Sequence, residues 1–216
     1  MRTILLLCFT LFIAYTFAQP RVVTFDSKQK ESEPITETNS IKLHILEYLS
    51  KDYSLYYEKA LLNKLSAEVG LGVTFGDEWG NIVTNTSYSP ISPENKMGIS
   101  LFGGVRFYPY EVFEDFYVAL EYKYRKYKWE REVIDYSTSN QGIPLQVDEG
   151  RNHSMPRVTF GYVFYLIDNL TLDLHLGIGI NTKTEILFNP KTYKVEKHKL
   201  NAMPRVNGVV KIGYVF

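Results

Sequence analysis

The stretch of sequence that decides the fold is residues 170–180, LTLDLHLGIGI. Its even-numbered positions are all leucine or isoleucine, and its odd-numbered positions are threonine, aspartate, histidine and glycine. Strict alternation of this kind predicts a β-strand with one apolar and one polar face. Alternation alone leaves open which face points inward. It also puts Asp173 and His175 together on the polar face, where they could belong to an active site or to a structural network.

The same alternation recurs from residue 41 to the end of the sequence. It predicts eight strands, which lie at 41–49, 53–61, 65–75, 98–109, 116–129, 157–166, 170–180 and 205–216. Most of them approach the roughly 9–11 residues that a tilted strand needs to cross a bilayer. Residues 41–216 are therefore expected to form one antiparallel, all-β domain.

The connections between these strands alternate in length. Three are tight turns, whereas residues 76–97, 132–153 and 185–202 are long and polar. Short periplasmic turns at one rim and long extracellular loops at the other are typical of transmembrane β-barrels of the outer membrane. For both ends of the barrel sequence to lie at the short-turn rim, the connection SKDY (50–53) must be a tight turn at the outer rim.

The N-terminal residues have the features of an export signal. Arg2 precedes an apolar segment that is too short to span a bilayer as a retained helix, and the following Thr-Phe-Ala fits a cleavage site. We therefore predict a signal peptide at 1–18. Residues 19–40 are polar and charged, so we expect a flexible periplasmic leader there.

Composition excludes two classes of site. Cys8 is the only cysteine and would leave with the signal peptide, so the mature chain is expected to form no disulfide and no thiolate metal site. The chain has 24 Lys and Arg against 24 Asp and Glu, which gives a formal net charge of zero. It therefore has no basic footprint for nucleic acid.

Two architectures accommodate strands with one apolar face. A secreted, lipocalin-like barrel keeps that face inside around a ligand, whereas a membrane barrel turns it outward to lipid. Three features favour the membrane barrel. The apolar faces carry almost no charge, the polar faces combine glycine with charged residues as a narrow lumen requires, and aromatic residues gather near the strand ends. We therefore expect the leucine face of 170–180 to contact lipid.

At this point the chain resembles the small outer-membrane β-barrel proteins of Gram-negative bacteria, of the eight-stranded OmpA- and OmpX-like type, over residues 41–216. YSLYYEKALLNKLSAEVGLG (53–72) is similar to the opening hairpin of many such barrels of uncharacterised function. The ending IGYVF resembles the signal that the barrel-assembly machinery reads, with Tyr214 and Phe216 as its aromatic residues. Lys211 stands where that signal usually has glycine, so the match is partial.

The resemblance implies a cell outer-membrane location and three kinds of partner. They are outer-membrane lipid and lipopolysaccharide, the barrel-assembly machinery, and another envelope protein. It carries over no catalytic residue and no cofactor, because a fold does not specify a function.

Charged residues on the predicted inner face form the main candidate site. Eight strands enclose a lumen only just wide enough to be filled by side chains, and buried charges must be paired. We therefore predict an ion-paired plug, with a narrow ion pore as the alternative. The predicted lumen charge network is Glu58, Glu68, Arg106, Glu121, Lys123, Arg125, Arg157, Asp173, His175, Arg205 and Lys211, with Lys42 and His44 on the same face.

Asp173 and His175 could also be two members of a hydrolase triad. That role requires a nucleophile within hydrogen-bond reach of the histidine, for which Thr171 and Ser66 are the candidates. No nucleophile elbow or oxyanion motif accompanies them, so a buried ion-paired histidine is the preferred interpretation.

His153 and Ser154 raise a second enzymatic alternative, because some outer-membrane barrels are lipid A deacylases that use His and Ser. Adjacent residues point to opposite faces of a strand, which disfavours that role. The sequence also has no zinc, calcium or phosphate-loop motif. We therefore expect no enzymatic activity, no metal and no cofactor.

The strand at 116–129 continues to alternate past its apolar part. Tyr122, Tyr124, Lys126 and Lys128 share its outward face, where the lysines could reach lipopolysaccharide phosphates at headgroup height. A solvated strand tip is the alternative. The long loops carry charges of both signs, which suits docking of a partner. The resulting hypothesis is a non-enzymatic outer-membrane protein with a structural or surface-docking role.

Overall fold

Antiparallel β-structure accounts for nearly all of the chain that the structure describes. The computed structural model describes residues 38–75, 94–135, 143–189 and 192–216. The predicted signal peptide and most of the predicted leader lie outside these ranges. The elements in chain order are β1 (Asn39–His44), α2 (Ile45–Leu49), β2 (Asp52–Leu62), β3 (Leu65–Thr74), β4 (Glu94–Phe107), β5 (Asp115–Asp135), β6 (Ile143–Ile167), β7 (Leu170–Asn189), β8 (Lys194–Lys199) and β9 (Met203–Val215).

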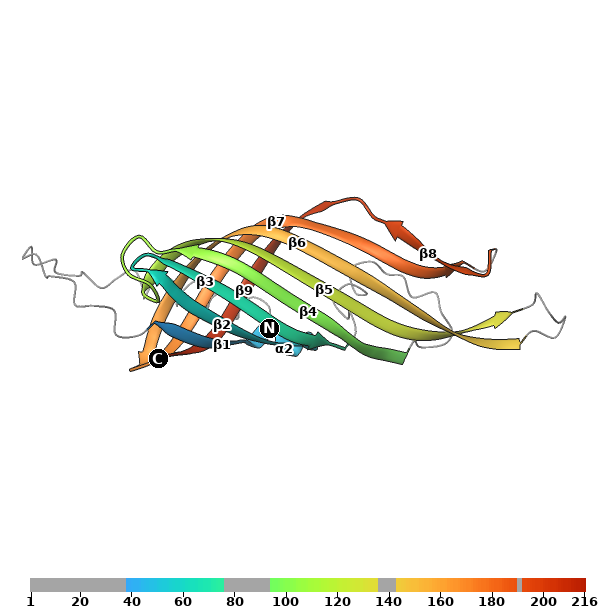
Figure 1. The fold of residues 1–216 in the computed structure, drawn as a ribbon, viewed down its shortest axis with the longest axis horizontal. Coiled ribbons are helices and arrows are strands. Elements are labelled where there is room, and N and C mark those ends of the chain that lie inside the picture. The colour runs from blue at the N-terminus through green and yellow to red at the C-terminus, as the bar shows by residue number, and fades with distance from the viewer. Residues whose placement is uncertain (1–37, 76–93, 136–142, 190–191) are drawn as a thin grey trace, which may run out of the picture. The chain divides into compact units, whose positions relative to one another are not determined.

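Eight of the nine described strands form a closed antiparallel ring (Figure 1). Each strand from β1 to β7 pairs with the next, β7 pairs with β9, and β9 pairs with β1. The ring is staggered. The row of paired residues that starts at Ser40 and runs through β2 to β7 arrives at Arg205, ten residues from Val215, which is the direct partner of Ser40 on β9. A stagger of this kind tilts the strands and allows a sheet to close. The predicted all-β, antiparallel fold is confirmed.

The two faces of the strands differ in polarity in the direction predicted from 170–180. On β7 the outward Leu176 is 63% exposed and Ile178 is 61% exposed, whereas the inward Thr171 and Asp173 are fully buried. The apolar residues of this strand therefore face away from the interior of the ring, and its polar residues fill that interior.

A small apolar core closes the short-turn end of the ring. The loop after β4 folds inward and buries Tyr108, Val112 and Phe113 against Tyr117 and Val163. Backbone hydrogen bonds fix this loop to the turn between β2 and β3, from Tyr108 N to Lys64 O at 2.8 Å and from Val112 N to Asn63 O at 3.1 Å. The lumen therefore has an apolar floor beneath its charged residues.

The expected strand at 41–49 is wrong in its second half. β1 ends at His44, and residues 45–49 form the helix α2. A continued strand would put Glu47 on the apolar outer face, because Ile41 and Leu43 face outward. The helix instead buries Glu47 in the lumen. The backbone N–H of Glu47 donates a hydrogen bond to His44 Nδ1, at 3.3 Å. In the described ranges, no helix has the length and apolar character needed to cross a membrane.

All three expected long loops are in part strands, and in 76–97 the strand part begins at Glu94, the first residue of β4. β5 continues to Asp135 and β6 begins at Ile143, so most of 132–153 is paired. β7 continues to Asn189, and β8 pairs with it on the same side as β9 does. These extensions are polar, which is why composition suggested loops there. In Figure 1 they run on past the end of the ring near α2.

Candidate functional site

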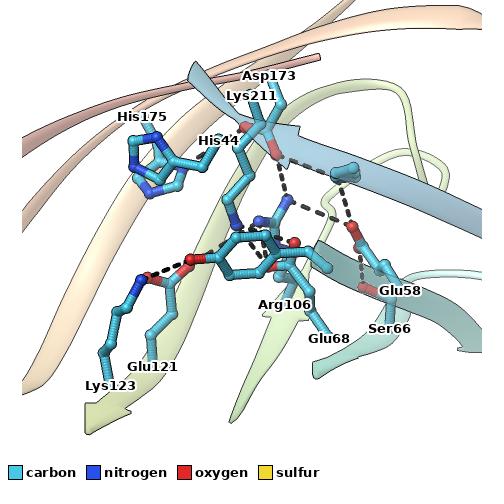
Figure 2. A network of polar contacts seen from close by, with 12 residues as sticks. His44, Glu58, Ser66, Glu68, Arg106, Glu121, Lys123, Asp173, His175 and Lys211 are labelled. Atoms are coloured by element: carbon cyan, nitrogen blue, oxygen red, sulfur yellow. Dashed lines mark hydrogen bonds and ion pairs between the residues drawn. The ribbon is translucent and has the colours of Figure 1, made fainter. Parts of the chain in front are cut away.

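Arg106 is the hub of a buried charge cluster near the short-turn end of the lumen (Figure 2). Its guanidinium lies 2.7 Å from Asp173 Oδ2 and 2.6 Å from Glu68 Oε2, with Glu58 Oε2 at 3.4 Å. It also stacks over the Tyr117 ring, 4.4 Å from the centroid. The Arg106 side chain and the three carboxylates are fully buried. One planar cation thus bridges carboxylates that three different strands supply.

Two lysines complete this lower cluster. Lys42 Nζ lies 2.5 Å from Glu58 Oε2 and 3.1 Å from Asp173 Oδ2. Lys211 Nζ lies 2.9 Å from both carboxylate oxygens of Glu68. We use the name lower cluster for Lys42, Glu58, Glu68, Arg106, Asp173 and Lys211. Its three cations and three anions are all fully buried, so each charge depends on its partners rather than on water.

Hydroxyl groups supply further hydrogen bonds to these carboxylates. The Ser66 and Tyr108 hydroxyls both donate to Glu58 Oε1, the latter at 2.9 Å. The Tyr117 hydroxyl donates to Asp173 Oδ1 at 2.6 Å. Satisfied networks of this type hold a unique arrangement, because an unpaired buried charge is costly.

Asp173 and His175 lie together, but their surroundings do not form a hydrolase site. Tyr117 Oη lies 2.9 Å from His175 Nδ1. Because the Tyr117 hydroxyl donates its proton to Asp173, Tyr117 Oη accepts a hydrogen bond from His175 Nδ1. Ser66 is bound to Glu58, and in the described part of the chain no hydrogen bond joins His175 to Ser66 or Thr171. In the ranges that the structure describes, no three His, Cys, Asp or Glu side chains form a group that could hold a metal ion.

A second cluster lies beyond the lower one, toward α2. Glu47 contacts Lys123 Nζ and lies 2.7 Å from Arg125 Nη2. Asp52 Oδ2 lies 3.1 Å from Lys123 Nζ and 2.5 Å from Arg125 Nε. The Tyr56 hydroxyl links the group, since it donates to Glu47 and accepts from Lys123. We use the name upper cluster for Glu47, Asp52, Lys123 and Arg125. Arg125 remains 14% exposed, so this cluster is less enclosed than the lower one.

A third group of lumen charges is the ion pair between Arg157 on β6 and Glu121 on β5. Arg157 Nε donates to Glu121 Oε2 at 2.6 Å, and Glu121 Oε1 lies 4.0 Å from Arg106. Across these groups the lumen balances six cations with six anions, which are Lys42, Arg106, Lys123, Arg125, Arg157 and Lys211 against Glu47, Asp52, Glu58, Glu68, Glu121 and Asp173. The paired charges of these three groups therefore cancel.

Arg205 differs from the other predicted network residues. The structure brings the other ten together inside the ring, whereas Arg205 is exposed. β1 ends at His44, opposite Lys211, so β9 has no described strand beside Arg205 on that side. Arg205 nevertheless shares a row of paired residues with the inward Arg157 and Gly179, and its place in the lumen charge network stays a prediction.

Sequence reasoning missed two carboxylates of the upper cluster. The sequence pattern predicts a strand at Glu47 and a turn at Asp52, and so puts neither carboxylate on the inner face. A signal for them is present in the predicted charge network. Lys123 and Arg125 lie farther from the short turns than its acidic residues do, so the network has no carboxylate at their level in the lumen.

The predicted outward residues point away from the lumen. Tyr122 is 48% exposed, and its hydroxyl lies 2.9 Å from Ser154 Oγ on β6. Lys128 is exposed, and Tyr124 and Lys126 are half-buried. His153 and Ser154 lie on opposite faces of β6, with His153 buried inside.

The predicted assembly residues lie at the short-turn end. Tyr214 and Phe216 both point outward and their rings stack with centroids 6.5 Å apart. Phe216 N donates to Asn39 O at 2.8 Å, and Asn39 N donates to Phe216 O at 3.0 Å. The last residue is thus hydrogen-bonded to the first residue of β1.

Comparison with known proteins finds a likeness of fold. No family model matches the chain, and no curated protein matches it. Among solved structures, the chain is similar to a major outer membrane protein from Thermus thermophilus. The two share 13% sequence identity and a TM-score of 0.41, over 83% of this chain and 99% of the other.

Proposed function

We propose that this chain is a non-enzymatic outer-membrane β-barrel protein of the eight-stranded OmpA- and OmpX-like type, with a lumen plugged by paired charges. The observation that carries the proposal is the inversion of polarity across the wall. Leucine, isoleucine and aromatic side chains are exposed on the outside of every strand of the ring, while twelve paired charges lie inside it. A continuous apolar belt of this extent is stable in lipid and aggregation-prone in water.

The lipocalin-like alternative requires the opposite arrangement. An apolar ligand cavity would line the interior, and polar residues would line the surface. The described lumen instead contains the lower and upper clusters above an apolar floor of Tyr108, Val112 and Phe113. This distribution supports the membrane barrel over the secreted binding barrel.

The narrow-pore alternative requires a water-filled path beside the charges. In the lower cluster, Arg106, Glu58 and Glu68 are fully buried and in direct contact, which supports a plug. We expect planar bilayers containing the purified protein to show no conductance steps. Reproducible steps that change when Arg106 is replaced would favour the pore.

The proposed role is structural or in docking at the cell surface. The partners that we propose are outer-membrane lipid and lipopolysaccharide, the assembly machinery acting on Tyr214 and Phe216, and another envelope protein bound by the long loops. Export would depend on the signal peptide at 1–18. Residues 76–93 and 136–142 of those loops lie outside the described residues.

A pair of substitutions on opposite faces of β7 tests the face assignment. Leu174→Arg puts a charge on the outer face, where it should destabilise the inserted protein by about 2–4 kcal/mol. Thr171→Val is the control, because the Thr171 hydroxyl is buried inside and makes no hydrogen bond in the described region. The measurement is urea unfolding in phosphatidylcholine vesicles, alongside fractionation of cells. Recovery of the folded wild-type protein in the aqueous fraction without detergent would refute the proposal.

A further inference from the structure

We propose that the outer surface carries a binding site for the phosphate-bearing headgroup of a membrane lipid. The inference rests on the proposed function, because it places the ring in a bilayer. The site consists of four lysines with two polar residues between them, and we call it the lysine belt. Its members are Lys126 and Lys128 on β5, Asn152 on β6, Thr184 on β7, and Lys197 and Lys199 on β8.

The strand register brings these residues into two adjacent rows. In the first row, Lys126 pairs with Asn152, Asn152 with Thr184, and Thr184 with Lys199. The second row runs from Lys128 to Lys197 through two residues without polar side chains. Each row therefore has a lysine at both ends. Neighbouring strands lie about 4.8 Å apart, so the two ends of a row are separated by roughly 14 Å.

The lysine belt begins where the apolar surface ends. On β5 the outward residues change from Leu120, Tyr122 and Tyr124 to the lysines of the belt. On β7 they change from Ile178 and Ile180 to threonines. Tyrosine followed by lysine at this boundary is the order expected between the hydrocarbon and the headgroups.

The belt lysines are available to a ligand. Across the described ranges, none of the four forms an ion pair with a carboxylate, and three of them are exposed while Lys126 is half-buried. The outward carboxylates one row beyond Lys128 are Glu130 and Asp148, and Lys96 binds both, at 2.6 and 2.8 Å, while Lys128 acts on Asp148 only through its charge. The belt therefore presents positive charge that no described carboxylate pairs directly, on the side that the proposed function turns to lipid.

The floor between the lysines suits a polar headgroup. Asn152 Oδ1 is buried and accepts no hydrogen bond from any described residue. Rotation of the Asn152 side chain would bring this acceptor to a headgroup hydroxyl, while phosphates at either side would meet the lysines. The geometry thus points to a headgroup with hydroxyls between phosphates, which is the chemistry of a phosphorylated glycolipid.

The test is titration of lipid A, dispersed in a neutral detergent, into the purified full-length protein in the same detergent. We expect dephosphorylated lipid A to bind at least about ten-fold more weakly than lipid A. The quadruple variant K126Q/K128Q/K197Q/K199Q should lose a similar factor for lipid A, because each surface lysine near anionic lipid contributes on the order of a few-fold in affinity. The pairs K126Q/K128Q and K197Q/K199Q should each lose part of it.

The matched control is K59Q/K64Q, which removes two exposed lysines at the short-turn end and should leave the affinity unchanged. Unaltered affinity of the quadruple variant would overturn the inference, as would equal binding of inorganic phosphate at the same concentration. Insertion into phosphatidylcholine vesicles separates the two proposals. A protein that inserts there but ignores the phosphates refutes only the lysine belt, whereas a protein that enters no bilayer refutes the proposed function as well.

Discussion

The lower and upper clusters inside the ring contain similar ion pairs but have different walls. Strands surround the lower cluster on every side, and its members are fully buried. The upper cluster is bounded on one side by α2, and Arg125 within it is partly exposed. Enclosure, rather than the number of ion pairs, therefore decides how much each charge depends on its partner. Coulomb interactions and desolvation costs both grow as water is excluded.

The largest expected effect is the loss of the lower hub. Arg106→Met leaves Glu68 and Asp173 with too few cations and should destabilise the protein by about 3–5 kcal/mol. Arg125→Met is the matched change in the upper cluster and should cost about 1–2 kcal/mol, because Lys123 remains beside both upper carboxylates. Urea unfolding in phosphatidylcholine vesicles measures both. Equal losses would show that enclosure does not distinguish the clusters.

The next effect concerns the attachment of α2. Glu47→Gln removes the charge that holds this helix to Lys123 and Arg125, and should cost about 2–3 kcal/mol. Hydrogen exchange should accelerate at α2 and at the neighbouring part of β9. Exchange in β5 and β6 should stay slow, since those strands do not depend on the helix for their pairing. Uniform acceleration over all strands would contradict this local account.

A pair of glycines separates packing inside the ring from packing outside it. A Cβ on Gly161 would clash with the Tyr117 ring, whereas a Cβ on Gly103 would meet nothing within 4 Å. Gly161→Ala should therefore destabilise the protein by about 1–3 kcal/mol, because it displaces a tyrosine that binds Asp173. Gly103→Ala should be neutral or slightly stabilising, by roughly 0.5 kcal/mol. A destabilised Gly103→Ala variant would contradict the outward orientation of that position.

The smallest effect belongs to the exposed ion pairs beyond the ring. Lys96 holds the pKa of the Asp148 carboxyl below its ordinary value through a direct hydrogen bond and its charge. A lowered folded pKa means that this pair contributes stability above the ordinary aspartate pKa, and the contribution disappears as the pH falls through the folded pKa. Lys96→Gln should return the Asp148 pKa toward its ordinary value in a carboxyl NMR titration. It should leave global stability almost unchanged, because exposed pairs contribute little.

Alternation in the sequence predicted most of the lower cluster and the ring that contains it. Glu68, Arg106 and Asp173 occupy alternate positions of long, regular strands, so their face follows from the pattern alone. Alternation leaves open whether Asp173 pairs with Arg106 or with Lys211, because that choice depends on the stagger of the ring. For example, Asp173 is directly opposite Lys211 on β9, yet Lys211 binds Glu68.

The upper cluster and β8 could not be predicted by the same pattern. Ile45–Leu49 alternates imperfectly, and a single turn of helix there is decided by where the Glu47 carboxylate finds cations. The segment that forms β8 has lysines on both faces, which gives no apolar side by which to recognise a strand. Its pairing with β7 is a tertiary effect that composition hides.

The short contact between β1 and β9 has a kinetic consequence. The register of these two strands runs from Ser40–Val215 to His44–Lys211 and is extended by the hydrogen bonds between Asn39 and Phe216, whereas β5 and β6 stay paired from Asp115 to Asp135. Every other pair of neighbouring ring strands is close in sequence. Each such pair can therefore form as a hairpin, or in the case of β7 and β9 as a hairpin with β8 in its connection, before the ring is complete. The β1–β9 seam joins the two ends of the domain and carries the greatest loop-closure entropy. It should form last during assembly and separate first when the protein is pulled apart by its termini.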